Sequence, residues 1–297
     1  THSTAPYDVD YDFLMSNRVD DLQTGIDIMS AIIDKPINFS ITHKKDSGFK
    51  NLNNVEIYNI KGVHPSGNES FQINKIDPLN FGETIWVIKP EDLSNIGAFF
   101  RTGVFSSSRT VAISGDSLKS PKYYSTVIGA SISSLINSDD MNDIKNYRFI
   151  NGDPLSGSKV EYSEFLGFYN NSLSVIEEGN QYRMLGWLPF MYNSVPSFSK
   201  TSFSWLLGGA KKVNTNLNGE ERAIVVTGEM EKYFPMDIFP MQLIKACMRG
   251  DIEKMESLGI YEVIPEDFGL VDFSCTSKIE AQEIIKSGIE IMLKEVG

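Results

Sequence analysis

The chain has 297 residues, of which 41% are hydrophobic and 22% are charged, and this composition predicts a globular protein with two or three domains. Its formal net charge of −12 at pH 7 argues against nucleic acid as a partner, because phosphate binding needs clustered Lys and Arg side chains. No stretch approaches the roughly 18 consecutive apolar residues of a membrane span, so the sequence predicts no transmembrane segment.

The first 115 residues alternate between helical and strand-like patterns. Apolar residues at helical spacing predict helices over residues 19–33 and 90–103. Short runs rich in β-branched residues predict strands over 37–42, 55–60, 84–88 and 110–114. This order predicts an α/β layer with a largely parallel sheet, and we assign it to a first domain over residues 1–118.

The second domain, over residues 119–180, has a different pattern. Strands are predicted at 123–128, 147–150 and 172–176, with a short helix over 132–136. A glycine- and proline-containing turn at 152–157 follows the second of these strands. These elements predict a small α+β unit.

Residues 181–222 form an aromatic-rich connector with few charges. Its aromatic residues include Trp187, Phe190, Tyr192, Phe198, Phe203 and Trp205, and they follow no clear period. Such a run is typical of a segment that covers a core, but exposed aromatic patches also mark docking surfaces. Both interpretations stay open at this stage.

The last domain, over residues 223–297, is predicted to be helical. One helix covers 241–248, and a second lies between an Asp251 cap and Gly259. Ser277 and Glu280 fit a capping box that would start the final helix.

The same domain contains two copies of the spacing with which bacterial ferredoxins bind iron–sulfur clusters, C-x2-C-x2-C-x3-C-P. The ligand positions of the second copy fall on Pro265, Phe268, Val271 and Cys275. Those of the first copy, 41 residues upstream, fall on Ile224, Thr227, Met230 and Phe234. A glycine follows the second position in both copies, and Pro235 follows the fourth position of the first copy. The two copies predict a degenerate two-cluster ferredoxin module.

Cys275 is the one ligand position that still carries a thiol. The only other cysteine is Cys247, and three histidines in the whole chain are too few to complete a zinc or iron–sulfur site with them. The mostly apolar replacements would fill the volume that clusters occupy in a ferredoxin. We therefore expect a structural remnant without metal, in which Cys275 is a core thiol. Low cysteine use is also typical of proteins in a reducing cytoplasm.

The loop 62–68 offers the candidate ligand-binding residues His64, Ser66 and Gly67. A glycine-flanked loop after a strand can bind phosphate through its backbone N–H groups. This loop lacks the G-x-G-x-x-G spacing and the lysine of a P-loop, so a tight turn at a domain junction is the simpler interpretation. No motif identifies a catalytic residue.

Taken together, these motifs resemble one family, the A subunit of the sodium-translocating NADH:quinone oxidoreductase. The resemblance is carried by residues 62–67, 77–78, 84–86, 228–229, 234–238, Pro240 and 275–278, which are spread over most of the chain. The two-copy motif also looks like the C subunit of the related Rnf complex, which keeps its cluster cysteines. The turn at 152–157 is similar to a loop of the soluble-ligand-binding β-grasp domain that both families share.

The resemblance implies a multidomain α/β and α+β protein with a Rossmann-like first domain, a β-grasp second domain and a helical ferredoxin-like remnant. It implies a peripheral subunit on the cytoplasmic face of the bacterial inner membrane, in a pump that passes electrons from NADH to quinone and exports Na⁺. Flavins, the iron–sulfur centre, NADH and Na⁺ would be handled by the other subunits, which are the expected partners. Quinone is a conceivable ligand without assigned residues, and the isolated chain is not expected to be catalytic.

The family also begins with a barrel-like domain and a first strand that this chain is expected to lack, so we expect a C-terminal fragment. Two other functions stay open. A stand-alone flavin- or nucleotide-binding oxidoreductase would use the α/β domain, although no phosphate-binding fingerprint follows a predicted strand. A redox-inactive interaction module, built from the α+β unit and the helical tail, would need no redox partner.

Overall fold

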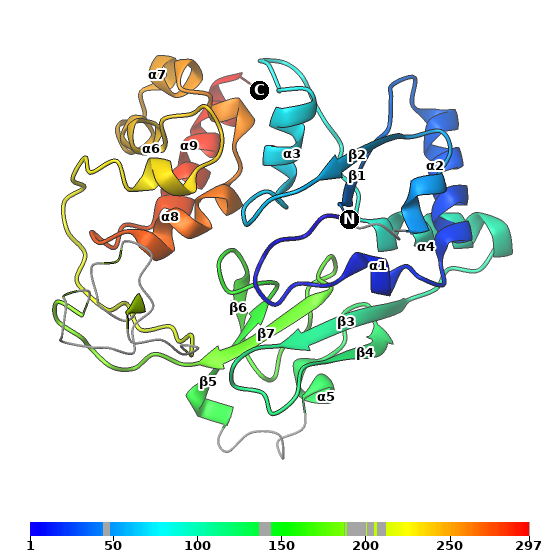
Figure 1. The fold of residues 1–297 in the computed structure, drawn as a ribbon, viewed down its shortest axis with the longest axis horizontal. Coiled ribbons are helices and arrows are strands. Elements are labelled where there is room, and N and C mark those ends of the chain that lie inside the picture. Colours follow the sequence, from blue (N-terminus) through cyan, green and yellow to red (C-terminus); the bar gives the residue numbers. More distant parts are fainter. Residues whose placement is uncertain are drawn as a thin grey trace.

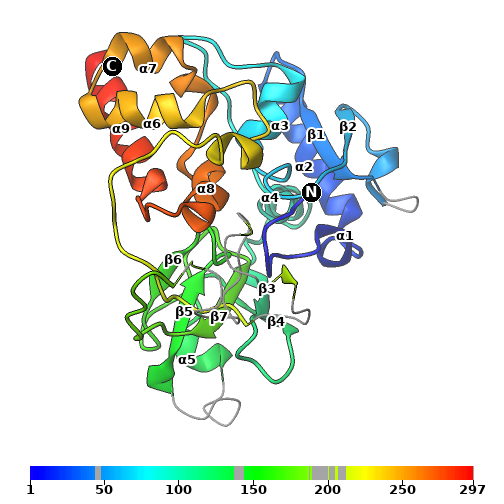
Figure 2. The same cartoon turned by 60° about the vertical axis from the view of Figure 1, so that its left-hand side comes forward.

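The structure is a computed structural model that describes residues 1–43, 48–136, 144–186, 188, 200, 205–206 and 212–296. Three parts lie around a common centre (Figures 1 and 2): a first layer of helices with a two-stranded sheet, a five-stranded sheet, and a helical bundle. Each part has its own cluster of buried apolar side chains. The overall class is mixed α/β, as the sequence predicts.

The first layer holds the elements from the N-terminus to residue 102. These are α1 (Tyr11–Leu14), α2 (Val19–Ile32), β1 (Asn38–Thr42), β2 (Glu56–Ile60), α3 (Glu69–Ile76) and α4 (Pro90–Thr102). Strands β1 and β2 pair in parallel. Helices α2 and α4 cross in close contact, since a Cβ atom added to Gly97 would lie 1.9 Å from the backbone oxygen of Asp21. Only glycine permits this approach of the two backbones.

The five-stranded sheet has the order β4-β3-β7-β5-β6. Its strands are β3 (Ser108–Ser114), β4 (Lys122–Val127), β5 (Tyr147–Asn151), β6 (Ser158–Val160) and β7 (Ser172–Glu177), with the short helix α5 (Ile132–Leu135) between β4 and β5. Strands β3 and β7 pair in parallel, while the other neighbours are antiparallel. Tyr11 of α1 packs with Val9 against Ala112 of β3, which joins the first layer to this sheet.

The helical bundle contains α6 (Pro240–Arg249), α7 (Ile252–Ser257), α8 (Gly269–Ser274) and α9 (Ala281–Val296). The predicted helices of this part are confirmed, including the Asp251 cap, whose side chain accepts from the backbone N–H of Lys254. Among the described residues, no helix is both long and apolar enough to cross a membrane.

Three sequence-based expectations about elements are wrong. Residues 84–88 do not form a strand, because nothing in the described part of the chain pairs with them. The strand expected at 110–114 exists as β3 but belongs to the five-stranded sheet and not to the parallel sheet of the first layer. The capping box of Ser277 and Glu280 is replaced by Asp272, whose carboxylate accepts from the backbone N–H groups of Ala281 and Gln282. Half of the aromatic-rich connector, with all of its six named aromatic residues except Trp205, lies outside the described residues.

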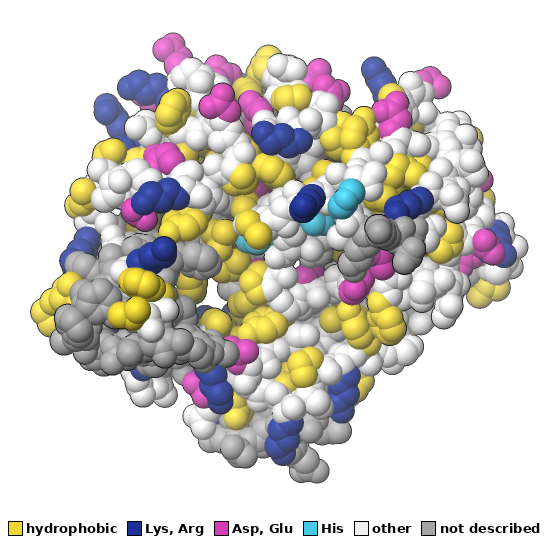
Figure 3. Space-filling view, viewed as in Figure 1, with side chains coloured by type: hydrophobic (Ala, Val, Ile, Leu, Met, Phe, Trp, Pro, Cys, Tyr) yellow, Lys and Arg dark blue, Asp and Glu magenta, His cyan; other side chains and the backbone are white. Residues whose placement is uncertain are grey.

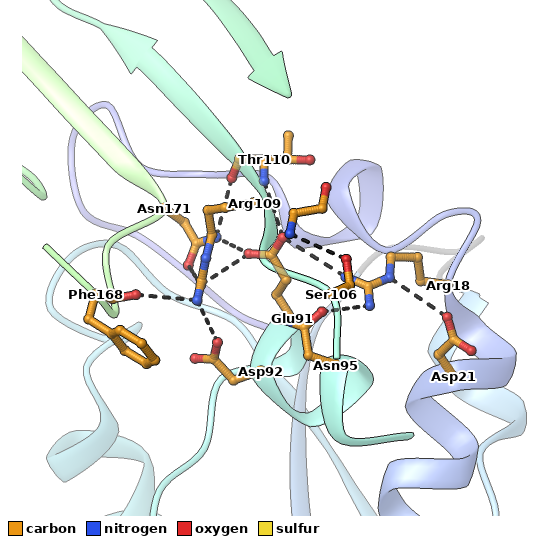
Figure 4. A network of polar contacts seen from close by, with 11 residues as sticks. Arg18, Asp21, Glu91, Asp92, Asn95, Ser106, Arg109, Thr110, Phe168 and Asn171 are labelled. Carbon is orange, nitrogen blue, oxygen red and sulfur yellow. Dashed lines mark hydrogen bonds and ion pairs between the residues drawn. The ribbon is translucent and has the colours of Figure 1, made fainter. Parts of the chain in front are cut away.

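A buried ion-pair network fixes the first layer to the five-stranded sheet (Figure 4). The guanidinium of Arg109 on β3 is 1% exposed and lies 3.2 Å from Glu91 and 2.8 Å from Asp92, both in the first turn of α4. It also donates to the side-chain oxygen of Asn171 and to the backbone oxygen of Phe168, just before β7. Glu91 in turn accepts from the backbone N–H of Thr110 on β3. One arginine therefore connects α4, β3 and the approach to β7.

We expect Arg109→Met to lower the free energy of unfolding by about 3–5 kcal/mol, because it removes the buried cation at 3.2 Å from the carboxylate of Glu91 and leaves only Arg18, at 4.0 Å. Urea unfolding followed by circular dichroism measures this loss. The control is Arg101→Met, which removes an exposed pair with Asp21 and should cost at most about 1 kcal/mol. Similar losses for both variants would contradict the assigned role of Arg109.

Candidate functional site

The three parts of the molecule meet at one junction, which we define as the loop 62–68, the loop 152–157 and the short 3-10 turn Pro265–Phe268 of the bundle. Histidine side chains lie in the middle of the face shown in Figure 3, and acidic and basic side chains are interspersed around it. This junction contains the candidate residues of the loop 62–68 and part of the degenerate ferredoxin motif.

Asp267 holds the first layer and the bundle together at the junction. Asp267 is only 2% exposed. Its carboxylate accepts hydrogen bonds from Ser70 Oγ at 2.6 and 2.7 Å and from Asn68 Nδ2 at 2.9 Å. The backbone N–H of Ile264 donates to the same carboxylate. Asn68 and Ser70 stand at the start of α3, so one carboxylate satisfies polar groups of both parts.

The loop 152–157 provides the third side of the junction. Gln282 of α9 donates through Nε2 to the backbone oxygen of Leu155 at 2.9 Å. Leu155 also lies over Gly269 at the start of α8, where an added Cβ atom would come within 3.1 Å of it. The five-stranded sheet thus reaches the bundle through the turn that the sequence analysis singled out.

Three backbone N–H groups of the loop 62–68 are engaged inside the protein. Those of Ser66 and Asn68 donate to backbone oxygens within the loop, and that of Gly67 donates to Thr4 Oγ1 at 2.9 Å. A phosphate cradle needs such N–H groups to be free. The geometry therefore favours the turn at a domain junction over a phosphate-binding loop.

The side chains of this loop lie against the N-terminal segment. Ser66 is buried, with its Oγ 3.2 Å from His2 Nε2, and His64 Nδ1 is 3.4 Å from Thr4 Oγ1. A Cβ atom on Gly67 would lie 2.5 Å from the backbone nitrogen of Thr4, so this close approach requires glycine. Within the described structure, His64 Nε2 is buried and has no hydrogen-bond partner. His2 is part of this cluster although sequence reasoning gave it no role.

Most ligand positions of the two ferredoxin-like copies lie in the core of the bundle. Met230, Phe234, Phe268, Val271 and Cys275 are all buried in one apolar cluster, against which Ile224 packs, whereas Thr227 is exposed and Pro265 is half-buried. The rings of Phe234 and Phe268 lie 4.9 Å apart, so the fourth position of the first copy touches the second position of the second copy. Conversely, the start of the first copy lies beside the end of the second, because Ser277 Oγ donates to the backbone oxygen of Ala223.

Neither thiol of the chain is placed for chemistry. Cys247 and Cys275 are both buried and unpaired, and burial raises the pKa of the Cys247 thiol to about 11. Among the described residues, no three His, Cys, Asp or Glu side chains gather in a way that could hold a metal ion. The hollow at the junction, lined by Pro65, Phe71, Phe234, Pro235, Met236 and Asp267, has no room for a water molecule. The arrangement can position the three parts, and it offers no binding pocket at this place.

The pH dependence of stability tests the environment of His64. Burial lowers the pKa of His64 below its ordinary value, while Asp153 acts in the opposite direction. Below about pH 6.5 the unfolded state therefore binds more protons than the folded state, and stability falls as the pH decreases toward the lowered folded pKa. We expect His64→Gln to reduce this loss between about pH 7 and about pH 5 in urea unfolding.

His43, an exposed histidine, provides the matched control for this measurement. Replacing it by Gln should leave the pH profile of stability nearly unchanged. Burial also lowers the pKa of His2. The stability of the His64→Gln variant should therefore still fall to some extent as the pH decreases. An unaltered profile in His64→Gln would contradict the buried position of this imidazole.

Two family models match the chain in order. The NqrA second alpha/beta domain matches residues 1–105, and the NQRA C-terminal domain matches residues 110–162. Together they cover more than half of the chain. The first match corresponds to the first layer, and the second begins in β3, where the five-stranded sheet begins.

Curated relatives carry the same family name. The A subunit of the Na(+)-translocating NADH-quinone reductase of Neisseria meningitidis serogroup C is 31% identical over 293 residues, which cover 98% of this chain and 65% of the relative. The corresponding protein of Haemophilus influenzae strain PittGG is 31% identical over 299 residues with the same coverage. That of Rhodopirellula baltica is 29% identical and is covered over 64% of its length. The chain thus spans slightly less than two thirds of the length of these relatives.

Both domain models and the relatives confirm the resemblance that the motifs indicate. The aligned part includes the junction, the five-stranded sheet and the bundle. The chain belongs to the family of A subunits of the Na(+)-translocating NADH-quinone reductases.

Proposed function

We propose that this chain acts as the larger part of a peripheral A subunit in a Na⁺-pumping NADH:quinone reductase. The complex passes electrons from NADH to quinone and couples this transfer to Na⁺ export, with the other subunits as the partners of this chain. The observation that carries the proposal is the alignment of nearly the whole chain with relatives of that name. A position on the cytoplasmic face of the membrane is part of the proposal, supported by the low cysteine content that is typical of proteins in a reducing cytoplasm.

Within the complex, the chain organises its surroundings and carries no redox centre of its own. Two features support this role. The junction is closed by internal hydrogen bonds of Asp267, and the former cluster positions are occupied mainly by apolar side chains. NADH, flavins, iron–sulfur clusters and Na⁺ are then handled by other subunits. Quinone binding stays a prediction for which the junction provides no pocket.

We further propose the finer fold assignments. The parallel pair β1-β2 with α2 and α4 supports a Rossmann-like layer, and the mixed five-stranded sheet supports a β-grasp domain. In two-cluster ferredoxins the fourth cysteine of each copy ligates the other cluster. The contact of Phe234 with Phe268 follows this crossed arrangement, which supports the ferredoxin-like remnant. The division at residues 118, 180 and 222 stays a prediction.

Affinity purification tests the proposed role. We expect a tagged chain, expressed in a bacterium that makes the pump, to retain the membrane subunits after mild detergent extraction. The eluate should show NADH:quinone reductase activity that Na⁺ stimulates. Elution without redox subunits would contradict the proposal and favour an isolated interaction module, and a yellow protein with flavin absorption would favour the stand-alone oxidoreductase.

Restoring thiols tests the crossed remnant and the absence of a native cluster. We expect the unaltered chain, purified without oxygen, to contain far less than one iron per chain. The variant Phe234→Cys/Pro265→Cys/Phe268→Cys/Val271→Cys should then take up about four irons after reconstitution with iron and sulfide, because it places four thiols at one former cluster position.

The matched control changes Pro265, Phe268 and Val271 to Cys and keeps Phe234, so that Cys275 would have to be the fourth ligand. In a crossed module, three of these four thiols lie at one cluster site and Cys275 lies at the other. The control variant should therefore bind no complete cluster. Equal iron uptake by both variants would contradict the crossed arrangement. Near-stoichiometric iron in the unaltered chain would contradict the proposal that it carries no cluster.

A further inference from the structure

The segment 84–88 has the amino-acid composition of a β-strand, but its side chains are as exposed as those of a surface loop. Its sequence, Thr-Ile-Trp-Val-Ile, consists of strong strand formers. In the described structure these residues adopt no regular secondary structure, and their backbone N–H groups make no hydrogen bond with a described residue. Trp86 is 90% exposed, Val87 56%, and Ile85 and Ile88 44% each. Local sequence preference and local structure disagree here, which indicates an absent partner.

The exposed apolar residues continue on both sides of this segment. Phe81 is 61% exposed and its ring packs on Tyr261 of the bundle at 5.6 Å. At the other end, Lys89 donates through Nζ to the backbone oxygen of Tyr169, next to the exposed ring of Phe168. We call Phe81 and residues 85–88 the apolar strip. Because exposed apolar surface of this kind marks an interface, we expect a further protein surface to cover the strip.

The occupant is indicated by the family comparison and by the position of the N-terminus. Residues 1–105 match a domain described as the second alpha/beta domain, and the relatives carry about a third of their length outside the aligned region. In both ribbon views the N-terminus lies beside the start of α4, which directly follows the segment 84–88 (Figures 1 and 2). A domain that leads into residue 1 would therefore enter the molecule next to the apolar strip.

Other occupants fit the observations less well. A lipid surface attracts proteins through clustered Lys and Arg, whereas the chain has a net charge of −12 and the segment is flanked by Glu83 and a single lysine, Lys89, which is already bonded to Tyr169. Pairing with a second copy of the chain is a separate outcome, which the exchange experiment below distinguishes by its dependence on protein concentration.

We propose that residues 84–88 form an edge strand that pairs with a strand of the first domain of the family's full-length chain, and that this domain covers the apolar strip. Main-chain hydrogen bonds supply the pairing, and alternate side chains enter the interface, as in the addition of a strand to a sheet edge. The proposal rests on the family assignment and does not depend on the proposed pump role.

Hydrogen exchange provides the test. One protein is the 297-residue chain, and the other is the same chain preceded by the first domain of the meningococcal relative. We expect the amides of 84–88 to exchange like an unfolded peptide in the first protein and at least about tenfold more slowly in the second. If the fusion does not unfold cooperatively, the whole meningococcal relative is compared with its own 293 aligned residues.

Proline variants separate strand pairing from simple covering. Successive N–H groups of a strand point to opposite edges, so proline at Ile85 and Val87, or at Trp86 and Ile88, removes one set of donors at a time. We expect one of these two double variants to lose the protection in the two-domain protein while neither alters the stability of the 297-residue chain. Val225 and Val226, also exposed and outside strands, provide the control positions, where proline should have no effect on the protection.

Three results would overturn the proposal. Equal exchange of 84–88 in the two proteins would show that the first domain does not cover this segment. Protection that develops in the 297-residue chain as its concentration rises would assign the strip to a second copy. Protection found only in the assembled membrane complex would assign it to a different component of that complex.

Discussion

The pairing of Arg109 is the interaction on which the arrangement of the first layer depends. A buried guanidinium costs several kcal/mol unless its charge is matched, so Glu91 and Asp92 must lie where β3 places the arginine. Both acids are in the first turn of α4, where the helix dipole also favours negative charge. The position of β3 in its sheet therefore fixes the start of α4. Through the close contact of Gly97 with α2, it fixes the first layer as a whole.

The bundle is attached by a different kind of contact. Asp267 has no cationic partner among the residues that the structure describes, and it accepts from neutral donors of Asn68, Ser70 and Ile264. Burial raises the pKa of Asp267, because these hydrogen bonds compensate only part of the lost solvation. The first layer is thus held to the five-stranded sheet by ion pairs of Arg109, and to the bundle by hydrogen bonds that uncharged donors make to Asp267. Both joints lie at the starts of helices, since Asp267 bonds side chains at the start of α3 and Arg109 pairs with acids in the first turn of α4.

Local patterns in the sequence predict most helices and strands but none of these joints. The spacing of apolar residues is enough for α2 and α4, and the Asp251 cap is a contact between residues three apart. Asp272 caps α9 from nine residues away, and Arg109 meets Asn171 across 62 residues, so neither has a local signature. The failure at 84–88 has the opposite cause. The local preference for a strand is real, but a strand also needs a neighbour, which no local pattern provides.

On the proposed ferredoxin-like assignment, the scaffold of the bundle persists after its metal ligands are lost. A cluster holds its bundle together through thiolate bonds, and here Phe234, Phe268 and Val271 provide instead the burial of large apolar side chains. The two former positions differ in how far this replacement has gone. The crossed pattern groups Phe234 with the first three positions of the second copy, and this set contains two aromatic rings in contact. The other set joins Cys275 to the first three positions of the first copy, and it includes the exposed Thr227. Because the free energy of burial scales with apolar area, the set that contains the two aromatic rings contributes more to the core of the bundle than the other set does.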